Sequence, residues 1–211
     1  MKIAVKNMVK SYGKETVLDN VTVSFEMGKI HGIIGRNGSG KSMLFKCIAG
    51  FVYIDSGEIL VDGMRIGHDC DFAPDMGIII EKPGFLPFYN AEKNLEILAA
   101  PRKLIGKKEI TEVIKRVGLS EAGRKKVGKY SLGMNQRLGI AQAIMENPSL
   151  LLLDEPMNGL DNQGVDDVRE LLKQLRLEGK TILLASHSTE DIALLCDTVH
   201  EMDKGRIMRI S

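Results

Sequence analysis

One glycine-rich segment, residues 35–42, constrains the fold of this 211-residue chain more than any other feature. It reads Gly35-Arg36-Asn37-Gly38-Ser39-Gly40-Lys41-Ser42, between an apolar run at 30–34 and a helical pattern at 42–49. The pattern G-x-x-x-x-G-K-[ST] in this context predicts a loop whose backbone N–H groups surround phosphate oxygens. Lys41 would reach the β- and γ-phosphates, and Ser42 would offer a hydroxyl to Mg²⁺. A chance glycine-rich turn rarely meets all these conditions, so we interpret the segment as a nucleoside-triphosphate site.

The short apolar runs show two hydrophobic patterns, alternating and non-alternating, which together predict an α/β fold. Alternating runs, typical of antiparallel strands joined by short turns, occur at 3–9, 21–25 and 57–61. Non-alternating runs, typical of parallel strands buried on both faces, occur at 30–34, 150–153 and 181–185. Helical patterns accompany them at 42–49, 135–145 and 164–178. We therefore expect a P-loop NTPase (RecA-like) core with a parallel-rich sheet and an N-terminal antiparallel β section.

The stretch from about 85 to 145 changes to helix signals, with runs at 91–100 and 108–117. We expect a helical subdomain here, inserted into a single domain that spans 1–211. Residues 102–129 carry ten basic and three acidic residues, a local balance of +7. A solvated basic face and a contact with an anionic membrane surface or partner both fit this balance.

Composition narrows the class of protein. Lys plus Arg number 29 against 28 Asp plus Glu, and tryptophan is absent, so we expect no nucleic-acid partner. No apolar run approaches the ~20 residues that cross a bilayer, so we expect a cytoplasmic chain. Cys47, Cys70 and Cys196 are far apart and lack the spacing of a metal or redox pair, so we expect them to be reduced.

Two further apolar runs end in polar residues suited to catalysis. Asp154 and Glu155 follow the run at 150–153, and the carboxyl ends of parallel strands are where ligands bind. Asp154 would hold Mg²⁺, while Glu155 would polarise or deprotonate the water that attacks the γ-phosphate. His187 follows the run at 181–185 and could donate to the γ-phosphate or orient that water. The remaining histidines, His31, His68 and His200, we interpret as structural or surface residues.

With these elements in order, the chain resembles the ATP-binding subunit of an ABC transporter almost from end to end. The deciding segment is Tyr130-Ser131-Leu132-Gly133-Met134-Asn135-Gln136-Arg137, a degenerate form of the LSGGQ signature. Tyr130, Leu132 and Met134 depart from that pattern. The resemblance implies that Ser131 and Gly133 touch the γ-phosphate held by the opposite subunit of a head-to-tail dimer. A helix N-terminus at 135–145 would complete this anion site. The alternative is that the segment is only a helix N-cap.

The same resemblance assigns roles to further residues. Tyr12 matches the aromatic residue that stacks on adenine, although a tyrosine in a turn is the simpler alternative. Asp161 ends a segment, Asn158-Gly159-Leu160-Asp161, that matches the D-loop linking the two sites of the dimer. ATP as the nucleotide is likewise implied by the resemblance, because stacking does not distinguish adenine from guanine.

Glu81 departs from the usual pattern, since the family has a glutamine at the corresponding position. A carboxylate there would lie near Mg²⁺ and next to the coupling surface for the membrane subunit. The alternative is an ordinary loop acid. Glu81 followed by Pro83 and an aromatic-rich stretch, together with the segment S-L-G-M-x-Q-R-L-G at 131–139, resembles the subgroup that confers immunity to lantibiotics and bacitracin-like peptides.

The resemblance implies an Mg²⁺-dependent ATPase subunit of an exporter of antimicrobial peptides or similar amphiphiles. It would act as a homodimer, or with a related ATPase subunit, on the cytoplasmic face of the membrane. A separate transmembrane permease would supply the path. The alternatives are a non-transport ABC-type ATPase acting on nucleic acid or ribosomes, and a P-loop kinase or GTPase.

Overall fold

The structure is a computed structural model that describes residues 3–81, 83–122 and 125–211. Lys82, and Arg124 from the basic stretch, lie outside the described residues. Within the described ranges the chain forms a four-stranded sheet and a six-stranded sheet. No helix in the described part of the chain is long and apolar enough to span a membrane.

The N-terminal section forms the smaller, antiparallel sheet, with strands in the order β2-β1-β4-β5. Ile3 pairs with Phe25 on one neighbour and with Val61 on the other, and all three side chains are buried. The alternation of the sequence runs therefore points one face inward, as expected. The bounds are β1 Ile3–Tyr12, β2 Glu15–Phe25, β4 Ser56–Val61 and β5 Met64–Arg65.

The larger sheet has the order β10-β9-β3-β8-β7-β6 and is parallel except for the pair of β9 and β10. Because β3, β7 and β8 run in the same direction, their carboxyl ends meet at one edge. Polar segments follow all three strands at that edge. The bounds are β3 Ile30–Ile34, β6 Met76–Ile79, β7 Leu150–Asp154, β8 Thr181–Ala185, β9 Thr198–Asp203 and β10 Arg206–Arg209.

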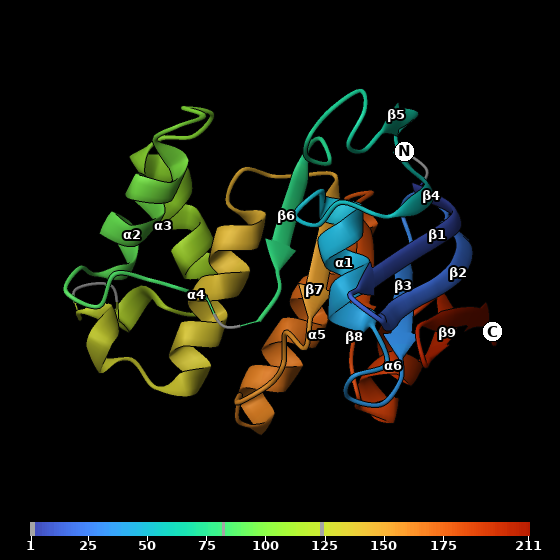
Figure 1. Cartoon of the computed structure of the whole chain (residues 1–211). Helices are drawn as coiled ribbons and strands as arrows, with labels where there is room; N and C mark the ends of the chain where they lie inside the picture. Colours follow the sequence, from blue (N-terminus) through green and yellow to red (C-terminus); the bar gives the residue numbers. More distant parts are fainter. Residues whose placement is uncertain (1–2, 82, 123–124) are drawn as a thin grey trace.

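Two apolar layers cover the two faces of the larger sheet. The first contains helix α1 (Lys41–Ala49), which lies between the two sheets in Figure 1. The second contains helix α5 (Asn162–Leu177) on the opposite face. Along β7, Leu150 and Leu152 belong to the first layer, whereas Leu151 and Leu153 belong to the second. This burial on both faces explains why the run does not alternate.

Helices α2 (Ala91–Ala99), α3 (Lys107–Arg116) and α4 (Leu132–Ile144) form the expected helical section. They gather at one end of the molecule, beyond β6 (Figure 1). The side chain of Asn90 caps α2 by accepting the N–H of Lys93 at 2.9 Å. In the basic stretch, Arg102 and Arg116 pair with glutamates outside it, Glu146 and Glu178.

Several elements differ from the sequence expectation. Helix α4 begins at Leu132 rather than at 135, because Ser131 caps it by accepting the N–H of Met134. Helix α5 likewise begins at Asn162 rather than at 164, because Asp161 caps it. Helix α6 (Thr189–Leu195), β5, β9 and β10 were not expected, since they are short and carry weak periodicity.

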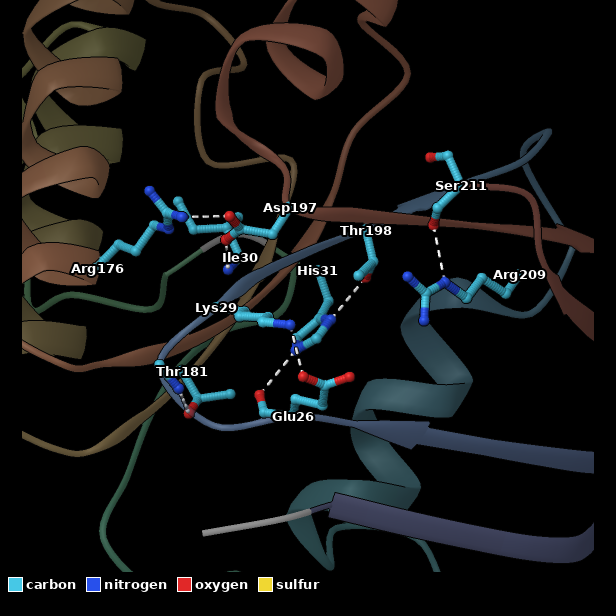
Figure 2. Close-up of polar contacts among 11 residues, drawn as sticks. Glu26, Lys29, Ile30, His31, Arg176, Thr181, Asp197, Thr198, Arg209 and Ser211 are labelled. Carbon is cyan, nitrogen blue, oxygen red and sulfur yellow. Dashed lines mark hydrogen bonds and ion pairs between the residues drawn. The ribbon is translucent and has the colours of Figure 1, made fainter.

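Polar contacts fix the start of β3, the strand that leads into the glycine-rich loop (Figure 2). His31 is buried, and its ring nitrogens lie 2.7 Å from Thr198 Oγ1 and 2.8 Å from the Glu26 carbonyl oxygen. Burial lowers the pKa of His31, and it lowers the pKa of the neighbouring His200 to about 4. Both are therefore neutral structural residues near pH 7, as expected, whereas His68 is exposed.

The three cysteines are free, as expected. Burial raises the pKa of Cys47 and of Cys196 to about 12. These thiols are therefore unreactive near pH 7.

Candidate nucleotide-binding site

The glycine-rich segment forms a loop between the end of β3 and the start of α1. Gly38 has φ 79°, and a Cβ there would meet no atom within 4 Å, so backbone N–H groups stay accessible on that side. A Cβ at Gly35 would lie 2.2 Å from the Met202 carbonyl oxygen, so only glycine permits the loop to pass β9. Ser39 is buried within the same loop.

The ammonium group of Lys41 lies inside the curve of this loop. It donates to the carbonyl oxygens of Gly35 at 2.7 Å and Arg36 at 3.1 Å, and the residue is only 7% exposed. A cation held at the N-terminus of α1 adds to the positive end of the helix dipole. The loop therefore concentrates positive potential where phosphate groups would bind.

Ser42 and Asp154 are 112 residues apart in sequence, yet the Ser42 hydroxyl donates directly to the Asp154 carboxylate. Ser42 belongs to the first turn of α1, and Asp154 ends β7. Hydroxyl and carboxylate oxygens are the hard ligands that Mg²⁺ prefers. Two of the three predicted metal residues, Ser42 and Asp154, thus lie together at the mouth of the phosphate loop.

Glu155 and His187, the two predicted catalytic residues, are in direct contact. Glu155 Oε2 lies 2.8 Å from His187 Nδ1. The Glu155 N–H donates to the Ala185 carbonyl oxygen at 2.9 Å, which fixes the residue just beyond β7 and β8. Gln136 also holds this turn, since its amide donates to the carbonyl oxygens of Glu155 and Pro156. A base and a histidine in this geometry can jointly hold and orient a water molecule.

One cavity of about 590 Å³ gathers half of the predicted site residues. The predicted residues that line it are Asn37, Gly38, Gly40, Lys41, Ser42, Glu81, Asp154 and Glu155. The sequence interpretation missed five further lining residues: Val17, Met43, Leu132, Gln136 and Asn158. Helical spacing could have indicated that Gln136 lines the cavity together with Leu132, because the two are one helical turn apart and so lie on the same face of the helix.

Glu81 lines this cavity and forms an ion pair that the sequence did not predict. Lys46 Nζ lies 2.6 Å from Glu81 Oε1, and this contact lowers the pKa of the Glu81 carboxyl. Lys46 follows Ser42 by four residues in α1, so helical spacing could have indicated that it faces the same site. Glu81 has φ 62°, and its side chain is 68% exposed.

Tyr12 ends β1 beside the cavity but is absent from the lining residues. The residue is 53% exposed, its hydroxyl lies 3.9 Å from Met43 Sδ, and the Lys10 ammonium lies 5.0 Å from the ring centroid. An exposed aromatic face next to the phosphate loop is suited to stacking on a base.

Ser131, Gly133 and Asp161 do not line the cavity either. Ser131 and Asp161 are the N-caps of α4 and α5, and Gly133 lies inside the first turn of α4. The signature segment is therefore a helix cap in its own chain. Both caps leave exposed helix N-termini that could approach a ligand on another molecule.

The fold and these contacts define a P-loop nucleoside triphosphatase: a loop that receives phosphates, oxygens for a metal ion, and an acid beside a histidine. The ABC transporter family model matches residues 18–158, which is more than half of the chain. The chain belongs to the ABC transporter family. It is an ATP-binding, ATP-hydrolysing subunit of that family.

Curated relatives agree with this assignment. An uncharacterized ABC transporter ATP-binding protein, YybJ of Bacillus subtilis, is 45% identical and covers 97% of this chain and 94% of the relative. The bacitracin transport ATP-binding protein BcrA of Enterococcus faecalis is 38% identical and covers 98% of this chain and 68% of the relative. The lantibiotic transport ATP-binding protein SrtF of Streptococcus pyogenes is 36% identical and covers 98% and 89%, respectively.

Solved structures share the fold. The dimeric structure of a bacterial ABC transporter cassette matches with a TM-score of 0.88 and 27% identity. The match covers 98% of this chain and 97% of the cassette. The expected P-loop core with an antiparallel N-terminal section and helical subdomain is therefore confirmed. ATP-binding subunits of this family dimerise and work with transmembrane permease components.

Proposed function

We propose that this chain powers the export of antimicrobial peptides or similar amphiphiles by hydrolysing ATP at the cavity between α1 and β7. The observation that carries the hydrolytic part of the proposal is the pairing of Glu155 with His187 beside the Ser42–Asp154 contact. Glu155 accepts a proton from the attacking water, and His187 holds the γ-phosphate or that water. Lys41 and the N–H groups of the loop stabilise the charge on the phosphates.

The donor set fits Mg²⁺, because a hydroxyl and a carboxylate already converge and Glu81 lines the same cavity. Ser42 and Asp154 would hold the ion, with Glu81 nearby. Bound Mg²⁺ would neutralise charge on the β- and γ-phosphates. Tyr12 would stack on the adenine from the side of Met43.

We further propose a head-to-tail homodimer, or a dimer with a related ATPase subunit, of single-domain chains spanning 1–211. Ser131 and Gly133 of one chain would contact the γ-phosphate bound by the other, and Asp161 would link the two sites. The position of these residues outside their own cavity supports this arrangement. A helix N-terminus capped by Ser131 supplies the anion-binding end.

A groove of about 260 Å³ next to Glu81 is the proposed docking surface for a transmembrane permease. It is lined by Phe51, Ile78, Ile79, Ile80, Glu81, Pro83, Gly84, Gly139 and Gln142. Phe51 is 53% exposed and packs edge-on against Phe72, which is 59% exposed. Exposed apolar side chains gathered beside a groove favour a protein interface. Docking there would place the subunit on the cytoplasmic face of the membrane.

Peptide export is proposed over a non-transport role because BcrA and SrtF are named for bacitracin and lantibiotic transport. The test is purification of the tagged chain from detergent-solubilised membranes of its own cells. We expect a polytopic membrane protein to copurify, and ATP turnover of the reconstituted complex to rise when a bacitracin-like or lanthionine peptide is added. Stable association with ribosomes or DNA, without a membrane protein, would overturn the proposal.

Glu81→Gln should change the Mg²⁺ dependence of hydrolysis. Removing one negative charge near the ion should weaken Mg²⁺ binding, so half-maximal hydrolysis should need about fivefold more Mg²⁺. The melting temperature should stay the same, because an ion pair with a 68% exposed partner contributes little stability. Lys46→Met is the matched variant, and it should lower the Mg²⁺ requirement by freeing Glu81. An unchanged Mg²⁺ titration in both variants would make Glu81 an ordinary loop acid.

A further inference from the structure

Helix α5 carries two arginines, Arg169 and Arg176, and each binds an aspartate near one end of α6. Arg169 donates from Nε and an NH2 group to Asp191 Oδ1, at 2.8 and 2.6 Å. Arg176, two helical turns later, donates to Asp197, whose other carboxylate oxygen accepts the N–H of Ile30 at 2.8 Å (Figure 2). These two ion pairs tie α6 to α5 at both of its ends.

The two pairs differ in burial. The side chains of Arg169 and Asp191 are 15% and 6% exposed, so the Asp191 carboxylate depends on Arg169 for compensation of its charge. Asp166 and Glu190 also lie 3.2 Å from the Arg169 guanidinium, but their side chains are 65% and 70% exposed and add little. The Arg176 side chain is 42% exposed. The constraint is therefore stronger at the end of α6 where Asp191 lies.

The end of α6 where Asp191 lies is next to His187, a predicted catalytic residue. Asp191 lies in the first turn of α6, whose N-cap, Ser188, directly follows His187. A polar cleft of about 570 Å³ separates this turn from the start of α5, and Glu155, His187, Arg169 and Asp191 all line it. Ile192 of the same turn is buried, but it lies against Gly32 of β3, so across the cleft the link between α5 and the His187 turn is the Arg169–Asp191 pair.

The opposite end of α6 is held differently. Leu195 belongs to the same buried apolar cluster as Leu172 and Leu175 of α5. Packing therefore supports the Arg176 end independently of its ion pair. At the His187 end, the Arg169–Asp191 pair carries the connection between the two helices.

We propose that Arg169 is a positioning residue for ATP hydrolysis, which holds the His187 turn in place against α5, the helix that Asp161 caps. The inference rests on the proposed roles of His187 and Asp161. His187 contacts Glu155 at 2.8 Å, and its own side chain is 68% exposed, so little else confines it. Without the pair, the short helix α6 can shift and carry the imidazole away from Glu155. Arg169 does not line the nucleotide cavity and would act through His187.

The test compares Arg169→Met, and the charge-balanced double variant Arg169→Met with Asp191→Asn, against Arg176→Met. The double variant removes the buried Asp191 charge together with its partner, and Asp166 and Glu190 are exposed, so it avoids the folding cost of the single change. We expect kcat for ATP to fall about tenfold or more in both Arg169 variants, with ATP affinity within about twofold of the unchanged chain. Arg176→Met should keep kcat within about twofold. Wild-type kcat in a folded double variant would overturn the proposal.

A second measurement separates positioning from general destabilisation. If Arg169 acts through His187, adding the double variant to His187→Ala should lower single-turnover hydrolysis by less than about twofold further. An equal fold loss in both backgrounds would indicate a purely structural role and overturn the inference. Wild-type turnover of His187→Ala alone would instead overturn the proposed role of His187. If His187→Ala hydrolyses ATP slowly while the Arg169 double variant hydrolyses it at the wild-type rate, only the positioning role of Arg169 is overturned.

Discussion

Glu155→Gln is expected to bind ATP normally, to accumulate as a stable dimer and to hydrolyse ATP at least about a hundredfold more slowly. Glutamine preserves the shape of the side chain at the end of β7, but it cannot take a proton from water. The Glu155 carboxylate contacts His187 and is not part of the phosphate loop at 35–42. The change should therefore remove the base and leave that loop undisturbed. Phosphate release measures turnover, and size-exclusion chromatography with ATP measures the dimer.

Glu112→Gln is the matched control for this variant, since Glu112 is exposed on α3, away from the cavity. It should leave turnover and dimerisation unchanged. If Glu155→Gln kept wild-type turnover, the assignment of Glu155 as the base would be wrong. If turnover fell together with ATP affinity, Glu155 would serve nucleotide binding instead.

Ser131→Arg and Lys41→Ala should each abolish turnover, for different reasons. Lys41 lies inside the phosphate loop, so its loss should weaken ATP binding by the isolated chain. Ser131 lies outside the cavity of its own chain, so Ser131→Arg should still bind ATP while its dimer cannot close. Nucleotide titration of each chain, followed by phosphate release, distinguishes the two defects.

Mixing the two inactive variants tests the head-to-tail arrangement directly. A mixed dimer would combine the intact phosphate loop of one chain with the intact signature of the other, restoring up to about a quarter of wild-type turnover. Leu132 and Gln136, from the same helix as the signature, line the cavity of their own chain. If the signature acted within one chain, the mixture would stay inactive. A second mixture combines wild-type chain with an equal amount of the double variant that carries both Lys41→Ala and Ser131→Arg. It should keep about a quarter of the wild-type turnover if the signature acts across the dimer, and about half if it acts within one chain.

The phosphate loop is the part of the structure that the local sequence predicts most fully. Its glycines, Lys41 and Ser42 predict a strand, a loop and a helix, and the structure contains all three. The apolar runs before Asp154 and His187 place both residues at strand ends, because strands buried on both faces are recognisable without alternation. The start of α4 was missed, since the cap at Ser131 is a side-chain contact rather than a periodic pattern.

The ion pairs of the site were beyond the reach of the sequence pattern. Lys46 and Glu81 are 35 residues apart, and Arg169 and Asp191 are 22 apart, on elements with no shared periodicity. Charge alone predicts neither pairing, because many acids and bases in this chain are equally available to one another. The position of each partner depends on how the helices pack against the sheet.

The sequence by itself determined which residues are candidates for the chemistry. The loop glycines, Lys41, Ser42, Asp154, Glu155 and His187 follow from residue type and local spacing. Only the tertiary structure decided how they meet. The parallel order of β3, β8 and β7 brings three distant strand ends to one edge, where Ser42 contacts Asp154 and Glu155 contacts His187. Strand order depends on long-range packing, and hydrophobic periodicity encodes only which face of each element is buried.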